Sequence, residues 1–75
     1  MYSKSEQIEI MKSAGYSESA AKGSLNIGVW FFDSLEELQE FGMENFGIEF
    51  TSSQYDKGIL NDKEVYFVDT LVYNV

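Results

Sequence analysis

The residues with the clearest capacity for chemistry are five acids near the middle of the chain. Asp33, Glu36, Glu37, Glu40 and Glu44 follow one another at steps of three, one, three and four residues. Such steps place carboxylates along one face of an α-helix. The segment contains no Lys or Arg, so each pair of acids four residues apart costs about 0.2–0.5 kcal/mol. Because interleaved lysines would give the same solubility without that cost, we predict a partner-binding surface here.

Two interpretations of these acids stay open. Either the carboxylates imitate a run of phosphates and bind a basic groove of another protein, or they form the solvated side of a helix. Residues 1–32 contain three lysines and three glutamates, whereas residues 33–75 contain ten acids and two lysines, so the second part has the whole net charge of −8. Such a field attracts basic protein surfaces and repels nucleic acid and anionic membranes. We therefore expect a protein partner, with no direct nucleic-acid or membrane contact.

The usual catalytic groups are missing from the sequence. It has no His and no Cys, which removes the commonest general base, the commonest metal ligand and any thiolate nucleophile. No glycine-rich phosphate loop is recognisable either. We therefore expect no enzymatic activity, no cofactor and no metal site. One oxygen-rich stretch departs from the spacing of a calcium-binding EF-hand; it comprises Asp56, Gly58, Asn61, Asp62 and Glu64.

Aromatic residues form a second candidate surface. Trp30 and Phe32 share one face of a predicted strand, and Tyr66 belongs to another strand. If no helix covered that face, these rings would form an exposed patch of the type that dominates protein–protein interfaces. We favour the alternative in which the N-terminal helices cover them. The three rings remain candidate interface residues for a partner or a homodimer.

Helices are predicted from serine caps, glycine stops and apolar residues at helical spacing. Ser34 opens a capping box with Glu37, in which each residue satisfies a backbone N–H of the other. This box begins the acidic helix, whose Leu35, Leu38, Phe41 and Phe46 are predicted to face inward. The predicted helices begin at Ser3 or Ser5, at Ser17, and at Asp33 or Ser34. The first two end before Gly15 and Gly23, and the third ends at Gly42 or Gly47, of which Gly47 fits the apolar pattern better.

Strands are predicted where apolar residues alternate. Residues 25–32 alternate over their whole length and have apolar side chains on both faces, as a central strand does. A short strand is predicted over residues 48–51, and a polar loop follows at 52–58. A hairpin is predicted next, with residues 59–60 and a long strand over 64–73 joined by the turn Asn61-Asp62. Asp69 interrupts the apolar face of the long strand and marks a bulge or an edge.

These elements predict an α+β fold with an N-terminal helical pair and a β-α-β-β core. Its sheet has three or four mostly antiparallel strands, and the acidic helix packs on it. At 75 residues we expect one domain, with residues 1–24 as the helical hairpin and residues 25–75 as sheet and acidic helix. A core this small gains from dimerisation, so a homodimer is left open. No secretory leader or membrane span is recognisable, and we expect a cytoplasmic location, in the host cell if a phage encodes the protein.

A family resemblance centres on residues 26–40. The stretch GSLNIGVWFFDSLEELQEF, followed later by EVYFVDT, resembles the opening of antirestriction proteins of the DNA-mimic type. In that family a glycine-containing strand ends in aromatic residues and leads into an acidic helix. The resemblance implies a phage- or plasmid-encoded inhibitor that occupies the DNA-binding groove of a restriction or CRISPR enzyme. It carries over Asp33, Glu36, Glu37, Glu40 and Glu44 as mimic charges, and nothing beyond them.

A second resemblance concerns residues 8–25, IEIMKSAGYSESAAKGSL, which are similar to the helix-turn-helix of phage terminase small subunits. It implies a small DNA-binding or packaging module. The second helix, however, has only Lys22 as a cation and has Glu18 at the end where bases would be met. We therefore favour a hairpin that completes the core. A structural, dimerising accessory domain, in which the acids serve solubility alone, is the third alternative.

Overall fold

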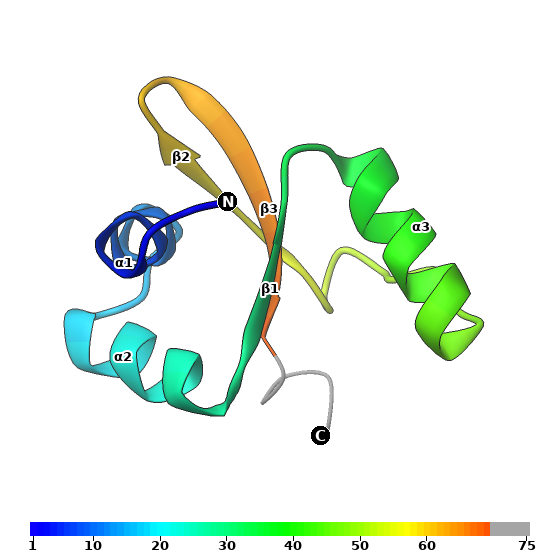
Figure 1. Cartoon of the computed structure of the whole chain (residues 1–75), viewed down its shortest axis with the longest axis horizontal. Helices are drawn as coiled ribbons and strands as arrows, with labels where there is room; N and C mark the ends of the chain where they lie inside the picture. Colours follow the sequence, from blue (N-terminus) through cyan, green and yellow to red (C-terminus); the bar gives the residue numbers. More distant parts are fainter. Residues whose placement is uncertain (70–75) are drawn as a thin grey trace.

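Three helices and three strands make up the part of the chain that the computed structural model describes, residues 1–69 (Figure 1). The predicted α+β fold, with two N-terminal helices followed by a β-α-β-β arrangement, is confirmed. The predicted continuation of the last strand to residue 73 lies outside the described residues. In chain order the elements are α1 (Lys4–Ser13), α2 (Glu18–Ile27), β1 (Val29–Phe32), α3 (Leu35–Phe46), β2 (Asp56–Leu60) and β3 (Lys63–Asp69).

The sheet is antiparallel and has the strand order β1-β3-β2. β3 is therefore the central strand, because it pairs with both of the others. Asn61 and Asp62 form the turn between β2 and β3, with φ angles of 51° and 65°. Two successive residues with positive φ are typical of a two-residue type I′ hairpin, whose twist matches that of the strands. The predicted hairpin is confirmed.

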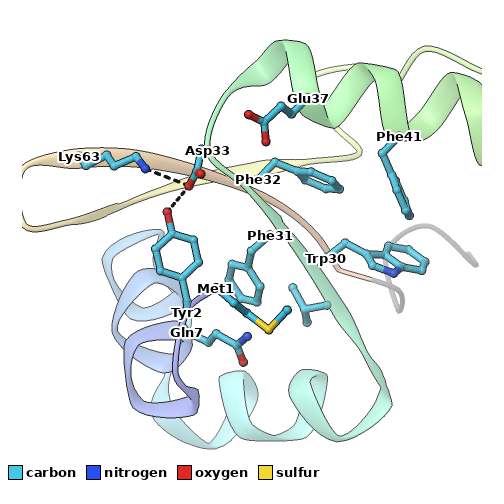
Figure 2. Close-up of a pocket in the computed structure, with 11 residues that line it drawn as sticks. Met1, Tyr2, Gln7, Trp30, Phe31, Phe32, Asp33, Glu37, Phe41 and Lys63 are labelled. Atoms are coloured by element: carbon cyan, nitrogen blue, oxygen red, sulfur yellow. Dashed lines mark hydrogen bonds and ion pairs between the residues drawn. The ribbon is translucent and has the colours of Figure 1, made fainter.

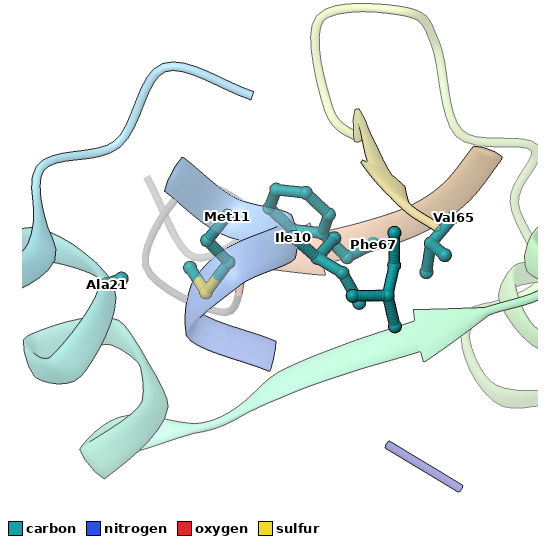
Figure 3. Close-up of a cluster of buried hydrophobic side chains, with 6 residues drawn as sticks. Ile10, Met11, Ala21, Val65 and Phe67 are labelled. Carbon is teal, nitrogen blue, oxygen red and sulfur yellow. The ribbon is translucent and has the colours of Figure 1, made fainter. Parts of the chain in front are cut away.

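Helices cover both faces of the sheet, so the protein has three layers. α1 and α2 lie on one side and α3 on the other (Figure 1). β3 contributes to both cores, because side chains alternate along a strand: Phe67 lies under α1 and α2, and Val68 lies under α3. The core under α1 and α2 (Figure 3) has as its buried members Ile10, Met11, Ala21, Leu60, Val65 and Phe67.

Serine side chains begin all three helices, as the sequence predicts. Ser3, Ser17 and Ser34 each accept a hydrogen bond from a backbone N–H in the first helical turn. These bonds satisfy groups that have no partner inside the helix. Ser3 and Glu6 complete a reciprocal capping box, while the hydroxyl half of the predicted box forms at Ser34. α3 ends at Gly47, whose φ of 66° is left-handed.

The second helix is longer than predicted, and the first strand is correspondingly shorter. α2 continues through Gly23 and ends at Gly28, whose φ is 140°, so the strand predicted over residues 25–32 begins only at Val29. Gly23 does not end the helix, because its φ is not positive and the positive φ of a glycine stop occurs instead at Gly28. Leu25, in the last turn of α2, packs against the core under α1 and α2.

The strand predicted over residues 48–51 is not formed, and the stretch predicted as a loop contains most of β2. Phe50 is buried in this connection, where the Gln39 side chain of α3 accepts from its N–H at 2.7 Å and donates to its C=O at 2.8 Å. A side-chain amide thus takes the place of a neighbouring strand. β2 reads as a loop in the sequence because Lys57 and Gly58 interrupt its apolar pattern.

β1 is an edge strand and not the central strand that its sequence predicts. Its two faces are both covered because helices lie on both sides of the sheet. Phe31 packs toward α1 and α2, and Trp30 packs toward α3. Apolar residues on both faces therefore do not distinguish a central strand from an edge strand in a three-layer fold. Leu35, predicted to face inward, is 37% exposed at the start of α3.

Asp69 is a buried acid in the apolar face of β3, with only 3% of its surface exposed. It pairs regularly with Val29 in β1, so it marks no bulge. Its carboxylate accepts hydrogen bonds from the Ser24 hydroxyl at 2.7 Å and from the Tyr16 hydroxyl at 2.9 Å. The acid therefore interrupts the apolar pattern because it ties α2 and the turn before it to the sheet.

Replacing Tyr16 by Phe should reduce the sensitivity of the fold to alkali. Burial, followed by the hydrogen bond to the Asp69 carboxylate, raises the pKa of the Tyr16 phenol above its ordinary value of 10.0. Stability from the neutral phenol is therefore fully present below pH 10 and is lost as the pH rises further. Urea unfolding followed by circular dichroism between about pH 8 and pH 11 measures this dependence. The wild type should lose stability more steeply above pH 10 than Tyr16→Phe, and equal slopes would contradict the assignment.

Candidate functional site

Four of the five predicted acids form one exposed side of α3. At 3.6 residues per turn, Glu36, Glu37, Glu40 and Glu44 fall within about 100° around the helix axis. All four residues are exposed. The opposite side of the helix faces the sheet, where Leu38 is fully buried. Folding therefore uses one side of α3 and leaves these four carboxylates, here called the acidic face, in solvent.

The acidic face has an average charge density similar to that along a DNA strand, although its individual steps of about 1.5, 4.5 and 6 Å are uneven. Glu36 and Glu44 are eight residues apart, which corresponds to about 12 Å along a helix that rises 1.5 Å per residue. Four charges over this length amount to about one per 4 Å, compared with about one per 3.4 Å along each strand of B-DNA. Averaged over its length, α3 therefore presents negative charge at about the axial density of one DNA strand.

The ion pairs leave the acidic face without a cation. None of those formed within residues 1–69 involves a residue of α3. Glutamates four residues apart on the helix therefore repel one another, which costs about 0.2–0.5 kcal/mol of helix stability per pair. The ion pairs join Lys12 and Lys22 to Glu18, Lys57 to Glu64, and Lys63 to Asp33.

Asp33, the fifth predicted acid, does not belong to the acidic face. It precedes the Ser34 cap, and its carboxylate accepts hydrogen bonds from the Tyr2 hydroxyl and from the Lys63 ammonium, the latter at 2.9 Å (Figure 2). The Tyr2 hydroxyl, followed by the Lys63 ammonium, lowers the pKa of the Asp33 carboxyl. Asp33 is therefore engaged within the protein, where it connects Tyr2 and the start of β3 to the short loop between β1 and α3.

The three candidate interface aromatics lie on the face of the sheet that α3 covers. The ring centroid of Phe41 in α3 is 5.0 Å from that of Trp30 and 5.1 Å from that of Phe32. Tyr66 lies 6.2 Å from Tyr55 on this side of the sheet. The prediction that the N-terminal helices cover these rings is wrong, because those helices lie on the other face. All three residues keep part of their surface exposed.

A groove of about 750 Å³ opens beside β1 (Figure 2). Residues 29–33 form its floor. Tyr2 and Gln7 line the wall on the side of α1, and Glu37 and Phe41 line the wall formed by α3. The sequence has no local signal for Tyr2 or Gln7 as site residues, because only the folded chain brings the N-terminal segment beside β1.

The α1–α2 hairpin lacks the charge of an element that reads DNA. Lys12 and Lys22 both lie near the Glu18 carboxylate, at 3.6 and 3.0 Å. Ala21 of α2 is fully buried against the core. A recognition helix instead presents free cations and amides to phosphates and base edges. The observed contribution of this hairpin is the packing of one face of the sheet.

Comparisons with models of protein families, with curated proteins and with solved structures find no match. No helix within residues 1–69 combines the length and the apolar character needed to cross a membrane. In the same part of the chain, no group of three or more acidic side chains is arranged to hold a metal ion.

Proposed function

We propose that this protein is a small acidic inhibitor whose acidic face binds a basic groove of a protein that handles nucleic acids. One observation carries the proposal: four exposed carboxylates follow one side of α3, and no ion pair within residues 1–69 neutralises them. The resemblance of residues 26–40 to DNA-mimic antirestriction proteins supports a host defence enzyme of restriction or CRISPR type as the target. A gene of a phage or another mobile element would encode such an inhibitor.

Inhibition of this kind needs no catalytic residue. A groove that binds duplex DNA is lined by Lys and Arg, and much of its affinity comes from the neutralisation of phosphates. The net charge of −8 steers the protein toward such a groove. Once bound there, α3 excludes the nucleic acid, because both ligands require the same cations. Inhibition should therefore be competitive with DNA and should weaken as salt is added.

Neutralising the acidic face should relieve inhibition of a DNA-cleaving enzyme. The variant Glu36→Gln, Glu40→Gln, Glu44→Gln removes three of the four charges while each side chain keeps its size. Exposed ion pairs contribute about 0.2–1 kcal/mol each, so the loss of three should raise the half-inhibitory concentration by about tenfold. Cleavage of a labelled duplex by purified restriction and CRISPR nucleases, titrated with wild type and variant, measures this.

A second variant controls for net charge. Glu9→Gln, Glu49→Gln, Asp62→Asn also removes three negative charges. All three residues are exposed outside α3, and none of them takes part in an ion pair within residues 1–69. It should inhibit nearly as well as the wild type. If the two variants weaken inhibition equally, overall charge and not the acidic face is responsible. If neither wild type nor variant inhibits any enzyme of these classes, the proposed function is wrong, and the structural or DNA-binding alternatives take its place.

A further inference from the structure

The two edge strands of the sheet, β2 and β1, differ in how they are protected against pairing with another chain. On β2, the backbone N–H of Ile59 donates to the Ser13 hydroxyl of α1 at 2.7 Å. Gly58 of the same strand lies directly against the backbone of Ile10. Lys57 is exposed there, and lysine on an edge strand discourages pairing with another chain. α1 and Lys57 together close the edge formed by β2.

β1 has none of these protections. Within residues 1–69, its backbone forms hydrogen bonds with β3 and with no other segment. Its sequence, VWFF, contains no Lys, Pro or Gly, and all four residues stay partly exposed although helices cover both faces. Alternate residues of such a strand present their N–H and C=O groups outward, where a further strand could pair with them.

This open edge is the floor of the groove of about 750 Å³. In Figure 1, β1 lies in front of β3, with α1 and α2 to one side and α3 to the other. In Figure 2, the rings of Trp30 and Phe41 lie on one side of β1, and those of Tyr2 and Phe31 lie on the other. An extended chain placed along β1 would therefore have its main chain against a strand edge and its alternate side chains against rings on either side.

The charges of the groove indicate which chain would fit. Lys63 and Asp33 line the groove but form an ion pair with each other at 2.9 Å. Glu37 lines the wall formed by α3 and takes part in none of the ion pairs within residues 1–69. It also adjoins Glu36 and Glu40 of the acidic face. An incoming segment with a cation opposite Glu37 is favoured, whereas an acidic segment is repelled.

We propose that the groove binds an extended segment of a partner protein, which adds to β1 as a fourth strand and places a Lys or Arg opposite Glu37. In such strand addition the main-chain hydrogen bonds give affinity, and the pockets for alternate side chains give specificity. A second copy of this chain is disfavoured, because it brings another −8 and its own β1 has no cation. The surface is independent of the proposed inhibition, apart from Glu37, which belongs to both.

Strand addition can be tested with peptides on the intact protein. The probe is an eight-residue peptide of alternating Val and Lys with blocked ends. Trp30 is the only tryptophan of the chain and lines the groove, so its fluorescence reports binding. The wild type should show a saturable change, and the NMR signals of the Val29–Phe32 amides should shift. Methylating alternate backbone nitrogens removes strand hydrogen bonds but keeps every side chain, and it should weaken binding at least about tenfold, which corresponds to 1.4 kcal/mol.

Two single variants of α3 provide the matched comparison on the protein. Glu37→Gln and Glu40→Gln remove the same charge from the same exposed side of the helix, but only Glu37 lines the groove. Glu37→Gln should weaken the Val-Lys peptide about two- to fivefold, as for a single exposed ion pair, and Glu40→Gln should change it less. A peptide of alternating Val and Glu should not bind.

Four results would overturn the proposal. Equal binding of the methylated peptide would exclude pairing with β1, and equal effects of the two variants would reduce the contact to general charge attraction. Absence of any peptide binding at millimolar concentration would remove the site. The last test combines sedimentation equilibrium, which shows whether the protein is a dimer, with hydrogen exchange of the Val29–Phe32 amides. A dimer in which these amides are protected from exchange would make a second copy the occupant. These outcomes are read without any nuclease, so they are separate from a failure of inhibition.

Discussion

Phe67→Ala should cost about 3–5 kcal/mol of folding free energy, the usual range for truncating a buried aromatic ring. Phe67 is fully buried in the central strand. Its ring lies 5.5 Å from that of Phe31 and 5.8 Å from that of Tyr16, so it joins β1 and the α1–α2 turn to β3. A chain of this length has a total stability of about 4–11 kcal/mol. Urea unfolding followed by circular dichroism should therefore show a midpoint at least about 1 M lower than that of the wild type, since the urea dependence of a small protein is about 1–3 kcal/mol per M.

Ile59→Ala is the matched control for this prediction. Ile59 is also an apolar strand residue, but 52% of it is exposed. Its truncation should cost no more than about 0.5 kcal/mol, as for most surface substitutions. If Phe67→Ala and Ile59→Ala had similar unfolding midpoints, the core described under α1 and α2 would be wrong.

Gly58→Ala should destabilise the protein by about 1–3 kcal/mol or more, the range for overpacking a core. A Cβ at position 58 would lie 2.2 Å from the carbonyl oxygen of Ile10 and 2.7 Å from its Cγ2 atom. The clash is with backbone, and Ile10 is itself fully buried, so α1 would have to move away from β2. Urea unfolding measures the loss.

Gly23→Ala should have the opposite sign. Gly23 is an exposed residue within α2, and no atom lies within 4 Å of where its Cβ would be. Alanine is better than glycine in a helix by about 0.5–1 kcal/mol, so this variant should be more stable than the wild type. If Gly58→Ala left the free energy of unfolding unchanged, or raised it as Gly23→Ala should, the described packing of α1 on β2 would be contradicted.

The features that the sequence predicts correctly depend on few neighbouring residues. Ser3 and Ser34 cap helices by bonding to N–H groups three residues away. Gly47 ends α3 with a backbone conformation that other residues avoid. Asn61 and Asp62 make a hairpin turn in which the two residues themselves adopt positive φ. In each case the chemistry that determines the structure is visible in the printed sequence.

The features that escape prediction depend on contacts between distant residues. Phe50 lies in a loop and not in a strand because Gln39, eleven residues earlier, bonds to both of its backbone groups. β2 is a strand despite its polar sequence because it pairs with β3 and because α1 packs against Gly58. The place of β1 at the edge follows from the path of β3 through the sheet, which no local pattern within residues 25–32 reveals.

In the candidate site, too, local spacing predicts one part, and contacts between distant residues determine the rest. The spacing of Glu36, Glu37, Glu40 and Glu44 predicts their common side of α3, because helical geometry alone determines it. Asp33 leaves this group because Lys63, thirty residues later, and the Tyr2 hydroxyl bind its carboxylate. The groove beside β1 could not be predicted, since its walls come from the N-terminal segment and from α3.

Binding of the acidic face in place of DNA is tested most directly by the displacement of a fluorescent DNA duplex from a DNA-cleaving defence enzyme, measured between about 50 and 200 mM salt. The wild type should displace the duplex, and its affinity should fall steeply as salt rises. The variant with Gln at positions 36, 40 and 44 should bind more weakly and show a shallower salt dependence. The variant Glu9→Gln, Glu49→Gln, Asp62→Asn should keep nearly the wild-type slope. Displacement with the same affinity and slope for wild type and acidic-face variant, or no displacement at all, would contradict the claim that the acidic face of α3 binds in place of DNA.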